Sequence, residues 1–187
     1  AMSHLLQLGH RRIVCLSGTR IQDNFRDRLR GYRETLKRWK IAYDERLVPN
    51  GEDESSPLNH LQLGYDKMRR VILDDIPFTA VFCSSDDFAF GALRAITEAG
   101  LEVPGDVSVV GFDDYEVSTY IRPPLTTVRQ PLEEMGSVAA AELLKIANVH
   151  RSERSSGALP PAEGRMVRRT FAPELKIRGS TAAPRKR

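Results

Sequence analysis

Two apolar patterns alternate along the chain: short continuous apolar runs, and longer stretches in which apolar residues recur every three or four positions. A continuous run bounded by polar residues or glycine is typical of a strand that is buried on both faces of a sheet. We therefore expect strands at 11–17, 79–84, 107–112 and 125–128, with a short edge strand at 46–49 and a short terminal strand at 172–180.

The helical pattern is clearest after the first strand, where apolar residues spaced 4, 3, 4 and 3 apart predict a helix from Asn24. These residues are Phe25, Leu29, Tyr32, Leu36 and Trp39. The same periodicity predicts helices at 60–74, 88–100 and 132–147. Ser85 or Asp86 is expected to cap the middle one, which Gly100 ends. Polar stretches at 50–59 and 149–165 predict a loop and a mobile segment.

Alternation of apolar strands with helices predicts an α/β fold with a parallel sheet covered on both faces, a three-layer lobe. Ligands of such sheets bind outside the carboxyl ends of the strands. Polar residues follow three of the predicted strands, at Ser17, at 84–86 and at 113–114. The sequence therefore predicts a polar ligand site at this edge of the sheet.

Two of the polar residues are the main candidates for ligand contact. Asp113 ends a strand, and its carboxylate either accepts hydrogen bonds from a polar ligand or caps the following helical turn. Arg28 lies one turn into the first helix and either reaches over the sheet edge or is a solvated helix charge. Asn24 and Ser85 are read first as helix caps, with ligand contact as the alternative.

Composition and charge narrow the function classes for this 187-residue chain, whose hydrophobic and charged contents of 41% and 28% are ordinary for a globular domain. The net charge is +3, but residues 165–187 hold eight Lys and Arg against one acid, so the other 164 residues sum to −4. A nucleic-acid-binding module normally places a basic stripe on a folded face. The sequence indicates no such stripe.

Several kinds of site are not predicted. The four histidines lack metal-ligand spacing, and Cys15 and Cys83 lie in strand-like runs as buried, reduced thiols. There is no G-x-S-x-G, no P-loop and no G-x-G-x-x-G, so we expect no enzyme activity, no cofactor and no metal. No apolar run is long enough to span a membrane, and no export signal is read at the N-terminus.

Five sequence segments together resemble the LacI/GalR family of bacterial transcriptional regulators. They occur in the family's order between about Leu5 and Thr181, and read LGHRRIVCLSG, RLRGY, TAVFCSSDDFAFGALRAITEAGLEVPGDVSVVGFDD, RPPLTTVRQPLEEMG and APELKIRGST. The resemblance implies a two-lobed effector domain of the periplasmic-binding-protein type, of which this chain covers the second lobe and the final return. It implies that the DNA-binding headpiece and most of the first lobe are missing.

By this resemblance we assign residues 11–128 to the C-terminal lobe and 129–180 to the crossover and return of the N-terminal lobe. Residues 1–10 would be the end of a helix from the missing lobe, and 181–187 a disordered basic tail. Asp113 and Arg28 match the family's ligand-binding aspartate and arginine. Asn24, Ser85 and Gln130 fall at positions that contact ligand in some members.

Two segments depart from the family pattern. GEDESSPLNH replaces a loop that often carries an aromatic residue, and Ser85 replaces a more usual asparagine. The resemblance implies a cytoplasmic regulator that senses a small polar, sugar-like effector and forms homodimers, with operator DNA bound only through a headpiece. We expect a half-cleft to bind effector weakly or not at all, and the apolar face of the 132–147 helix to favour self-association. The alternative is an exported sugar-binding protein of the same fold.

Overall fold

The computed structural model describes residues 1–18, 23–49, 59–156 and 168–185, without the side chains of 148–156. It contains two compact units, one formed by residues 1–129 and 175–187 and the other by 130–174. Unit 1 carries the sheet and most of the helices, and unit 2 is built around one long helix.

Unit 1 is an α/β unit with a largely parallel sheet, as the sequence predicted. The strands β1 (Ile13–Leu16), β2 (Ala80–Cys83), β3 (Ser108–Asp113) and β4 (Thr126–Arg129) are adjacent in that order, and each neighbouring pair is parallel. The short strand β5 (Glu174–Lys176) completes the five-stranded order at the far edge. Because all three of these pairs are parallel, the carboxyl ends of β1 to β4 lie at one edge.

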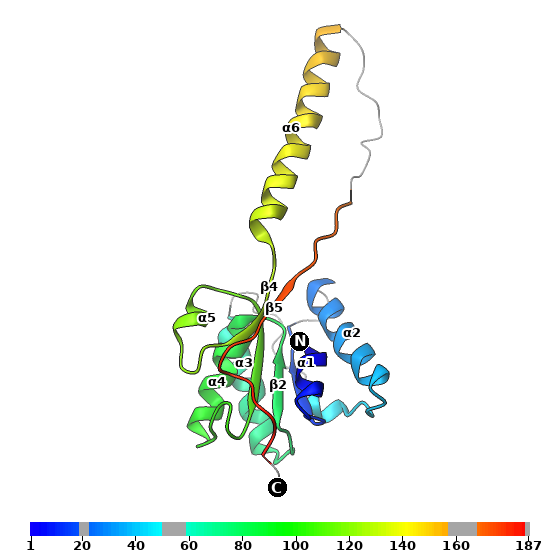
Figure 1. The fold of residues 1–187 in the computed structure, drawn as a ribbon. Helices are drawn as coiled ribbons and strands as arrows, with labels where there is room; N and C mark the ends of the chain where they lie inside the picture. Colours follow the sequence, from blue (N-terminus) through cyan, green and yellow to red (C-terminus); the bar gives the residue numbers. More distant parts are fainter. Residues whose placement is uncertain (19–22, 50–58, 157–167, 186–187) are drawn as a thin grey trace. The chain divides into compact units, whose positions relative to one another are not determined.

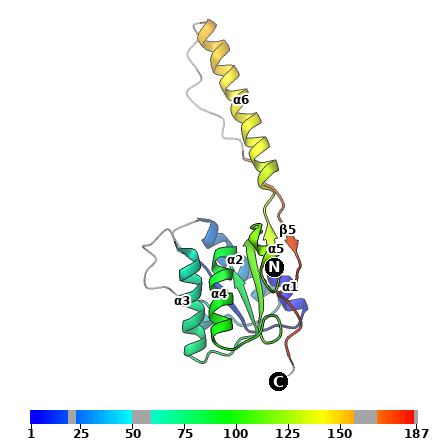
Figure 2. The same cartoon turned by 90° about the vertical axis from the view of Figure 1, so that its left-hand side faces the viewer.

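Helices cover both faces of the sheet in unit 1 (Figures 1 and 2). On one face, α3 (His60–Leu73) and α4 (Asp86–Glu98) bury a core with Val14, Leu16, Val81 and Val109. On the other, α1 (Met2–Gln7) and α2 (Asp23–Arg38) pack on the alternate strand residues, such as Ile13 and Val110. Since successive side chains of a strand point to opposite faces, both faces need apolar residues, which explains the continuous apolar runs.

A glycine pair allows α3 and α4 to pack closely. A Cβ at Gly91 would lie 2.0 Å from the carbonyl oxygen of Leu61, and one at Gly64 would lie 2.5 Å from that of Phe88. These distances are too short for any side chain, so the two backbones touch directly. This contact fixes the height of α4, whose N-terminus adjoins the end of β2.

The structure differs from the predicted elements in three places. Residues 46–49 form no strand, because the 3₁₀ helix η1 (Glu45–Leu47) is capped by the Asp44 side chain, which accepts from the Arg46 amide. The helix predicted at 132–147 extends further, as α6 (Leu132–Ser156), because no glycine or proline occurs between residue 147 and Gly157. The small helix α5 (Val117–Tyr120) was not predicted.

The two ends of the chain also differ from expectation. Residues 1–10, expected to come from the other lobe, lie in unit 1, where α1 buries Met2, Leu5 and Leu6 in the core. Residues 175–180 belong to unit 1 as well, where Ser180 Oγ donates to the Val109 carbonyl and accepts from the Thr126 amide.

The expected tail is not free where it is described. At 181–185 the Ala182 carbonyl accepts a 2.8 Å hydrogen bond from buried His10, and Arg185 pairs with Asp106. Residues 186 and 187, most of the 50–59 loop and 157–165 of the predicted mobile segment lie outside the described residues.

Candidate functional site

Arg28 and Asp113 meet at the carboxyl edge of the sheet, although 85 residues separate them in sequence. Arg28 projects from α2, and its NH2 lies 3.5 Å from Asp113 Oδ1 at the end of β3. The exposed fractions of the two side chains are only 14% and 15%. The pair is therefore largely shielded from solvent without being fully buried.

The Arg28 guanidinium is held by two further contacts. Its NH1 donates to the Ser84 carbonyl at the end of β2, and its Cζ lies 3.7 Å from the centre of the Phe112 ring. Stacking on an aromatic face suits a planar cation. Burial lowers the pKa of Arg28 below its ordinary value, and the charge of Asp113 partly opposes that shift. The guanidinium remains charged and keeps a fixed orientation.

Asp113 and Asp114 have unusual backbone conformations, with φ of 118° and 58°. Side chains other than glycine rarely adopt such angles, and the cost persists only where surrounding contacts enforce it. The reversal directs the two neighbouring carboxylates to different partners. Asp113 faces Arg28, whereas Asp114 pairs with Arg129 and Arg178 and has an exposed side-chain fraction of 2%.

Asp86 anchors the loop that follows these two residues. Its side chain is fully buried at the start of α4 and accepts hydrogen bonds from the Tyr115 amide, Ser118 Oγ and Thr127 Oγ1 at 2.9, 2.6 and 2.6 Å. Gly111 leaves room for it, since a Cβ there would lie 2.2 Å from Asp86 Oδ1. Asp86 is therefore an internal anchor that holds the β3–α5 loop.

The other predicted site residues are placed differently. Ser85 is buried and caps α4, with Oγ accepting from the Phe88 amide at 3.4 Å. Asn24 is exposed in the first turn of α2, where its Oδ1 accepts from the Phe25 amide at 2.9 Å. Gln130 belongs to unit 2. Of the five candidates, the structure brings together Arg28 and Asp113, which share a direct contact.

Sequence reasoning missed Phe112 and Ser84, which orient Arg28. Phe112 follows Val110 by two positions in β3, so the strand period places it on the face covered by α2. That signal was available once α2 was assigned to this face. Ser84 also carries a buried Oγ without a hydrogen-bond partner among the described residues.

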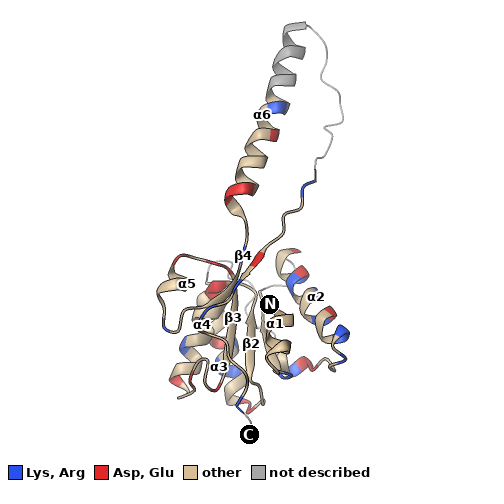
Figure 3. Cartoon of the chain, in the orientation of Figure 1, with Lys and Arg blue, Asp and Glu red and all other residues tan. Residues whose placement is uncertain are grey.

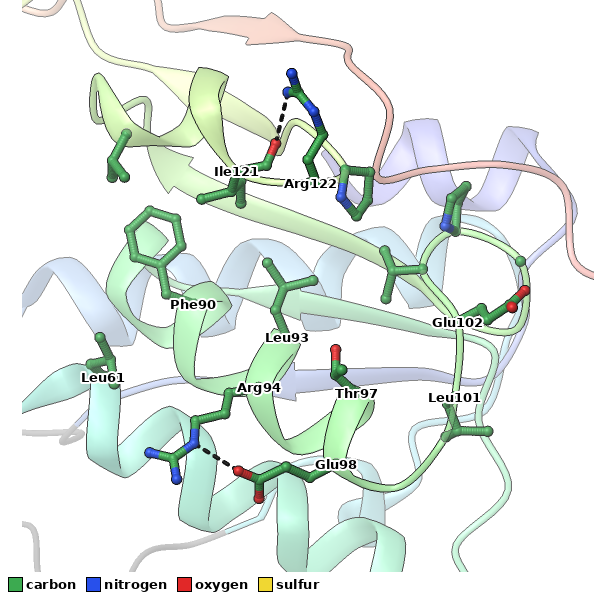
Figure 4. Close-up of a pocket in the computed structure, with 15 residues that line it drawn as sticks. Leu61, Phe90, Leu93, Arg94, Thr97, Glu98, Leu101, Glu102, Ile121 and Arg122 are labelled. Carbon is green, nitrogen blue, oxygen red and sulfur yellow. Dashed lines mark hydrogen bonds and ion pairs between the residues drawn. The ribbon is translucent and has the colours of Figure 1, made fainter.

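A second, apolar surface lies away from this edge, on the outer side of α4 (Figure 4). It is a pocket of about 870 Å³ that involves neither Arg28 nor Asp113. Arg94 and Glu98 pair at its rim, with Nε and Oε1 2.8 Å apart. Its apolar lining includes Leu61, Phe90, Leu93, Leu101, Val103, Val117 and Ile121.

The charge distribution and the placement of potential metal ligands leave this edge of the sheet as the main candidate site. Lys and Arg are interspersed with Asp and Glu over unit 1 rather than gathered on one face (Figure 3). Within the described residues no cluster of three or more His, Cys, Asp or Glu could hold a metal ion. Among the helices in the described part of the chain, none is long and apolar enough to cross a membrane. Both cysteines are buried, and burial raises the pKa of Cys15 to about 12.

Comparison with known proteins agrees with this architecture. A family described as periplasmic binding protein-like domain matches residues 2–181. The regulator GalR from Salmonella typhimurium is 37% identical over 184 residues, which cover 98% of this chain and 48% of the relative. The chain therefore spans about half the length of these curated relatives.

Solved structures give the same picture. A sugar-binding transcriptional regulator of the LacI family from Escherichia coli, complexed with phosphate, superposes with a TM-score of 0.79 at 30% identity. The match covers 97% of this chain and 59% of that one. A dimeric lac repressor with a C-terminal deletion gives a TM-score of 0.77 at 32% identity, covering 98% and 60%.

Proposed function

Because the chain belongs to the periplasmic-binding-protein-like domain family and to its LacI/GalR branch, we propose that it senses a small effector as part of a DNA-binding transcription regulator. The effector is a small neutral polyol or sugar that contacts Asp113 and Arg28. Operator DNA is bound by a headpiece outside this chain, in the bacterial cytoplasm where the operator lies. The chain performs no catalysis.

The Arg28–Asp113 pair is the observation that carries the proposal. The guanidinium offers several donors in a fixed fork, and the carboxylate offers acceptors, which together match the alternating donors and acceptors of adjacent hydroxyls. The two charges cancel at 3.5 Å, so the site favours a neutral ligand over an ion. Desolvating two charges is costly unless further hydrogen bonds satisfy them, and ligand hydroxyls would supply these bonds.

In the complete regulator, effector bound at this edge would also contact an opposite lobe. Ligand shifts the arrangement of two lobes only as far as it binds one arrangement better than the other. The residues on this lobe then set the affinity, and the movement of the lobes carries the signal to DNA. With one wall alone, we expect a dissociation constant of about 1 mM or weaker.

We also propose that the regulator is a homodimer in which a second copy covers the apolar pocket beside α4. Large apolar pockets with a polar rim are typical of protein interfaces. A twofold dimer also suits a palindromic operator. The solved structure of a dimeric lac repressor at 32% identity supports a homodimer, and the choice of the pocket rests on its apolar lining. This proposal replaces the expectation that the apolar face of the 132–147 helix drives self-association, because the exposed apolar residues of α6, including Leu143 and Leu144, are then left for the first lobe to cover.

Effector binding can be tested on this chain by NMR titration with D-galactose, D-ribose and cellobiose. We expect millimolar binding with shifts centred on Arg28, Phe112 and Ser84, and loss of these shifts in both Arg28→Gln and Asp113→Asn. Arg30→Gln is the matched control, because Arg30 lies on the same helix with an exposed side-chain fraction of 65%.

Shifts that persist in both site variants, or that lie far from β3, would contradict the assignment of the site. A lack of response to all three sugars at high concentration would contradict millimolar binding by this lobe alone. The coding DNA upstream of this chain distinguishes the function classes. An in-frame helix-turn-helix is expected, whereas an export signal would favour a sugar-binding protein of the same fold. The similarity of this chain to regulators such as GalR and CytR does not favour that alternative.

A further inference from the structure

The carboxylate of Asp114 is not used by the proposed effector site, yet it is one of the most enclosed charges in unit 1. Its exposed side-chain fraction is 2%, and its two oxygens bind different guanidinium groups. Arg129 Nε lies 2.5 Å from Oδ2, and Arg178 NH2 lies 2.6 Å from Oδ1. Each oxygen of the carboxylate therefore accepts a charge-assisted hydrogen bond.

The two arginines come from the segments through which the chain leaves and re-enters unit 1. Arg129 is the last residue of β4 and of the first part of unit 1, and Arg178 follows the return at Leu175. Arg178 is fixed further, because its NH1 donates to the Leu125 carbonyl at 2.7 Å and its amide donates to Thr126 Oγ1 at 2.9 Å. We call these two stretches, the end of β4 at Arg129 and the return at 175–178, the crossing segments. Asp114 thus joins the end of β3 to both crossing segments.

The electrostatics of Asp114 require both partners. Burial by itself raises the pKa of Asp114, but the hydrogen bonds from Arg178 and Arg129 outweigh it and bring the pKa below its ordinary value. A carboxylate held charged at such low exposure keeps its cations close, because leaving it unpaired would be strongly unfavourable. The geometry of the crossing segments and the position of Asp114 are therefore linked.

Asp114 and Asp113 are also linked through their backbone. The turn that they form has positive φ at both residues, a conformation that must be enforced from outside. Each residue of the turn has its own anchor: Asp113 contacts Arg28, Asp114 binds the two arginines, and the Tyr115 amide donates to Asp86. Releasing the middle anchor leaves the strained conformation without its strongest restraint.

We propose that Asp114 is a positioning residue that holds Asp113 against Arg28 and connects this pair to the two crossing segments. The inference rests on the proposed function only in taking the Arg28–Asp113 pair as the effector contact. A displacement of either crossing segment then moves Asp114, and through the shared turn it moves Asp113. In the reverse direction, a ligand that pulls on Asp113 changes the restraint on both segments.

The test uses the whole chain, labelled for NMR, without any ligand. The Phe112 ring lies under the Arg28 guanidinium, so its ring current displaces the Arg28 side-chain signal upfield. In Asp114→Asn, which keeps the shape and removes the charge, we expect this signal to lose most of its displacement while the backbone spectrum shows a folded protein. Asp106→Asn is the matched control, because it removes the ion pair with Arg185 at the other end of the sheet.

A purely structural role would lower the urea midpoint of Asp114→Asn without moving the Arg28 signal in the folded state, and that result would overturn the proposal. If Asp114→Asn does not fold, Arg129→Gln replaces it, since it removes the more exposed partner and leaves Arg178 in place. A smaller displacement in the same direction is expected there, and an unchanged Arg28 signal would refute the inference. These readouts need no sugar, so failure of effector binding would leave this test intact.

Discussion

Removing the Asp86 carboxylate is the most direct test of how the site is held together. In Asp86→Ala the Tyr115 amide and the hydroxyls of Ser118 and Thr127 all lose their acceptor inside the protein. A hydrogen bond to a charged group contributes about 1.5 to 3 kcal/mol, so three of them predict a loss of at least about 4.5 kcal/mol. This is a large part of the total stability of about 5 to 15 kcal/mol that a domain normally has.

Asp86→Asn should be much milder, and the difference between the two variants tests the reasoning. The Tyr115 amide can only donate, so the asparagine oxygen must face it and its NH₂ must face Thr127, whose hydroxyl can turn to accept. Loss of charge assistance alone predicts a cost of about 2 kcal/mol. Asp87→Asn serves as the control, because Asp87 is the partly exposed neighbour of Asp86 in the same turn. Its charge contributes only a helix-terminus effect of about 0.3 to 1 kcal/mol.

Urea unfolding measures these differences. With a denaturant slope of about 2 kcal/mol/M, the midpoint should fall by about 2 M in Asp86→Ala and by about 1 M in Asp86→Asn. We also expect the loop after β3 to become mobile in NMR spectra of Asp86→Ala. If Asp86→Ala unfolds within about 0.5 M of the Asp87→Asn control, the hydrogen bonds to Asp86 do not hold this loop and the reasoning is wrong.

Two further predictions concern association and pH. Phe90 lines the apolar pocket, so Phe90→Glu should weaken self-association at least tenfold, equivalent to about 1.4 kcal/mol, as measured by sedimentation velocity. Leu143→Glu, on the exposed face of α6, should leave self-association unchanged, and the opposite pattern would assign the dimer to α6. Burial lowers the pKa of His10 below 6.5, and that of His4 is lowered in the same way, so the unfolded chain binds protons first as the pH falls. The urea midpoint should therefore be constant above about pH 7.5 and decrease towards about pH 5.5, and it should decrease less steeply in His10→Gln. If the midpoint changes with pH equally in both proteins, His10 is not buried in its neutral form.

Local patterns predicted most elements of unit 1, because strand and helix periods are properties of neighbouring residues. The continuous apolar runs gave the strands, and the 3.6-residue period gave α2, α3 and α4. The failures have specific causes. The segment after Tyr43 formed a 3₁₀ helix because the Asp44 side chain caps it, and α6 continued past residue 147 because polarity indicates exposure and does not end a helix.

The candidate site was predictable only in part. The resemblance to a family indicated Asp113 and Arg28, whereas position and chemistry alone left each of them with an ordinary alternative. The pairs of neighbouring acids at 86–87 and 113–114 each contain one anchoring carboxylate, which the sequence could not identify. Asp86 and Asp114 differ from their neighbours in burial and in partners, and both properties come from distant segments.

By itself, the sequence determined the fold class, the order of the elements and the edge of the sheet where polar residues gather, since all three follow from local periodicity and from the direction of parallel strands. Only the tertiary structure decided which carboxylate faces the site and which one clamps the crossing segments. The reason is that a carboxylate's role depends on the cations that reach it. The cation of the pair with Asp113 lies 85 residues away along the chain, and those that bind Asp114 lie 15 and 64 residues away.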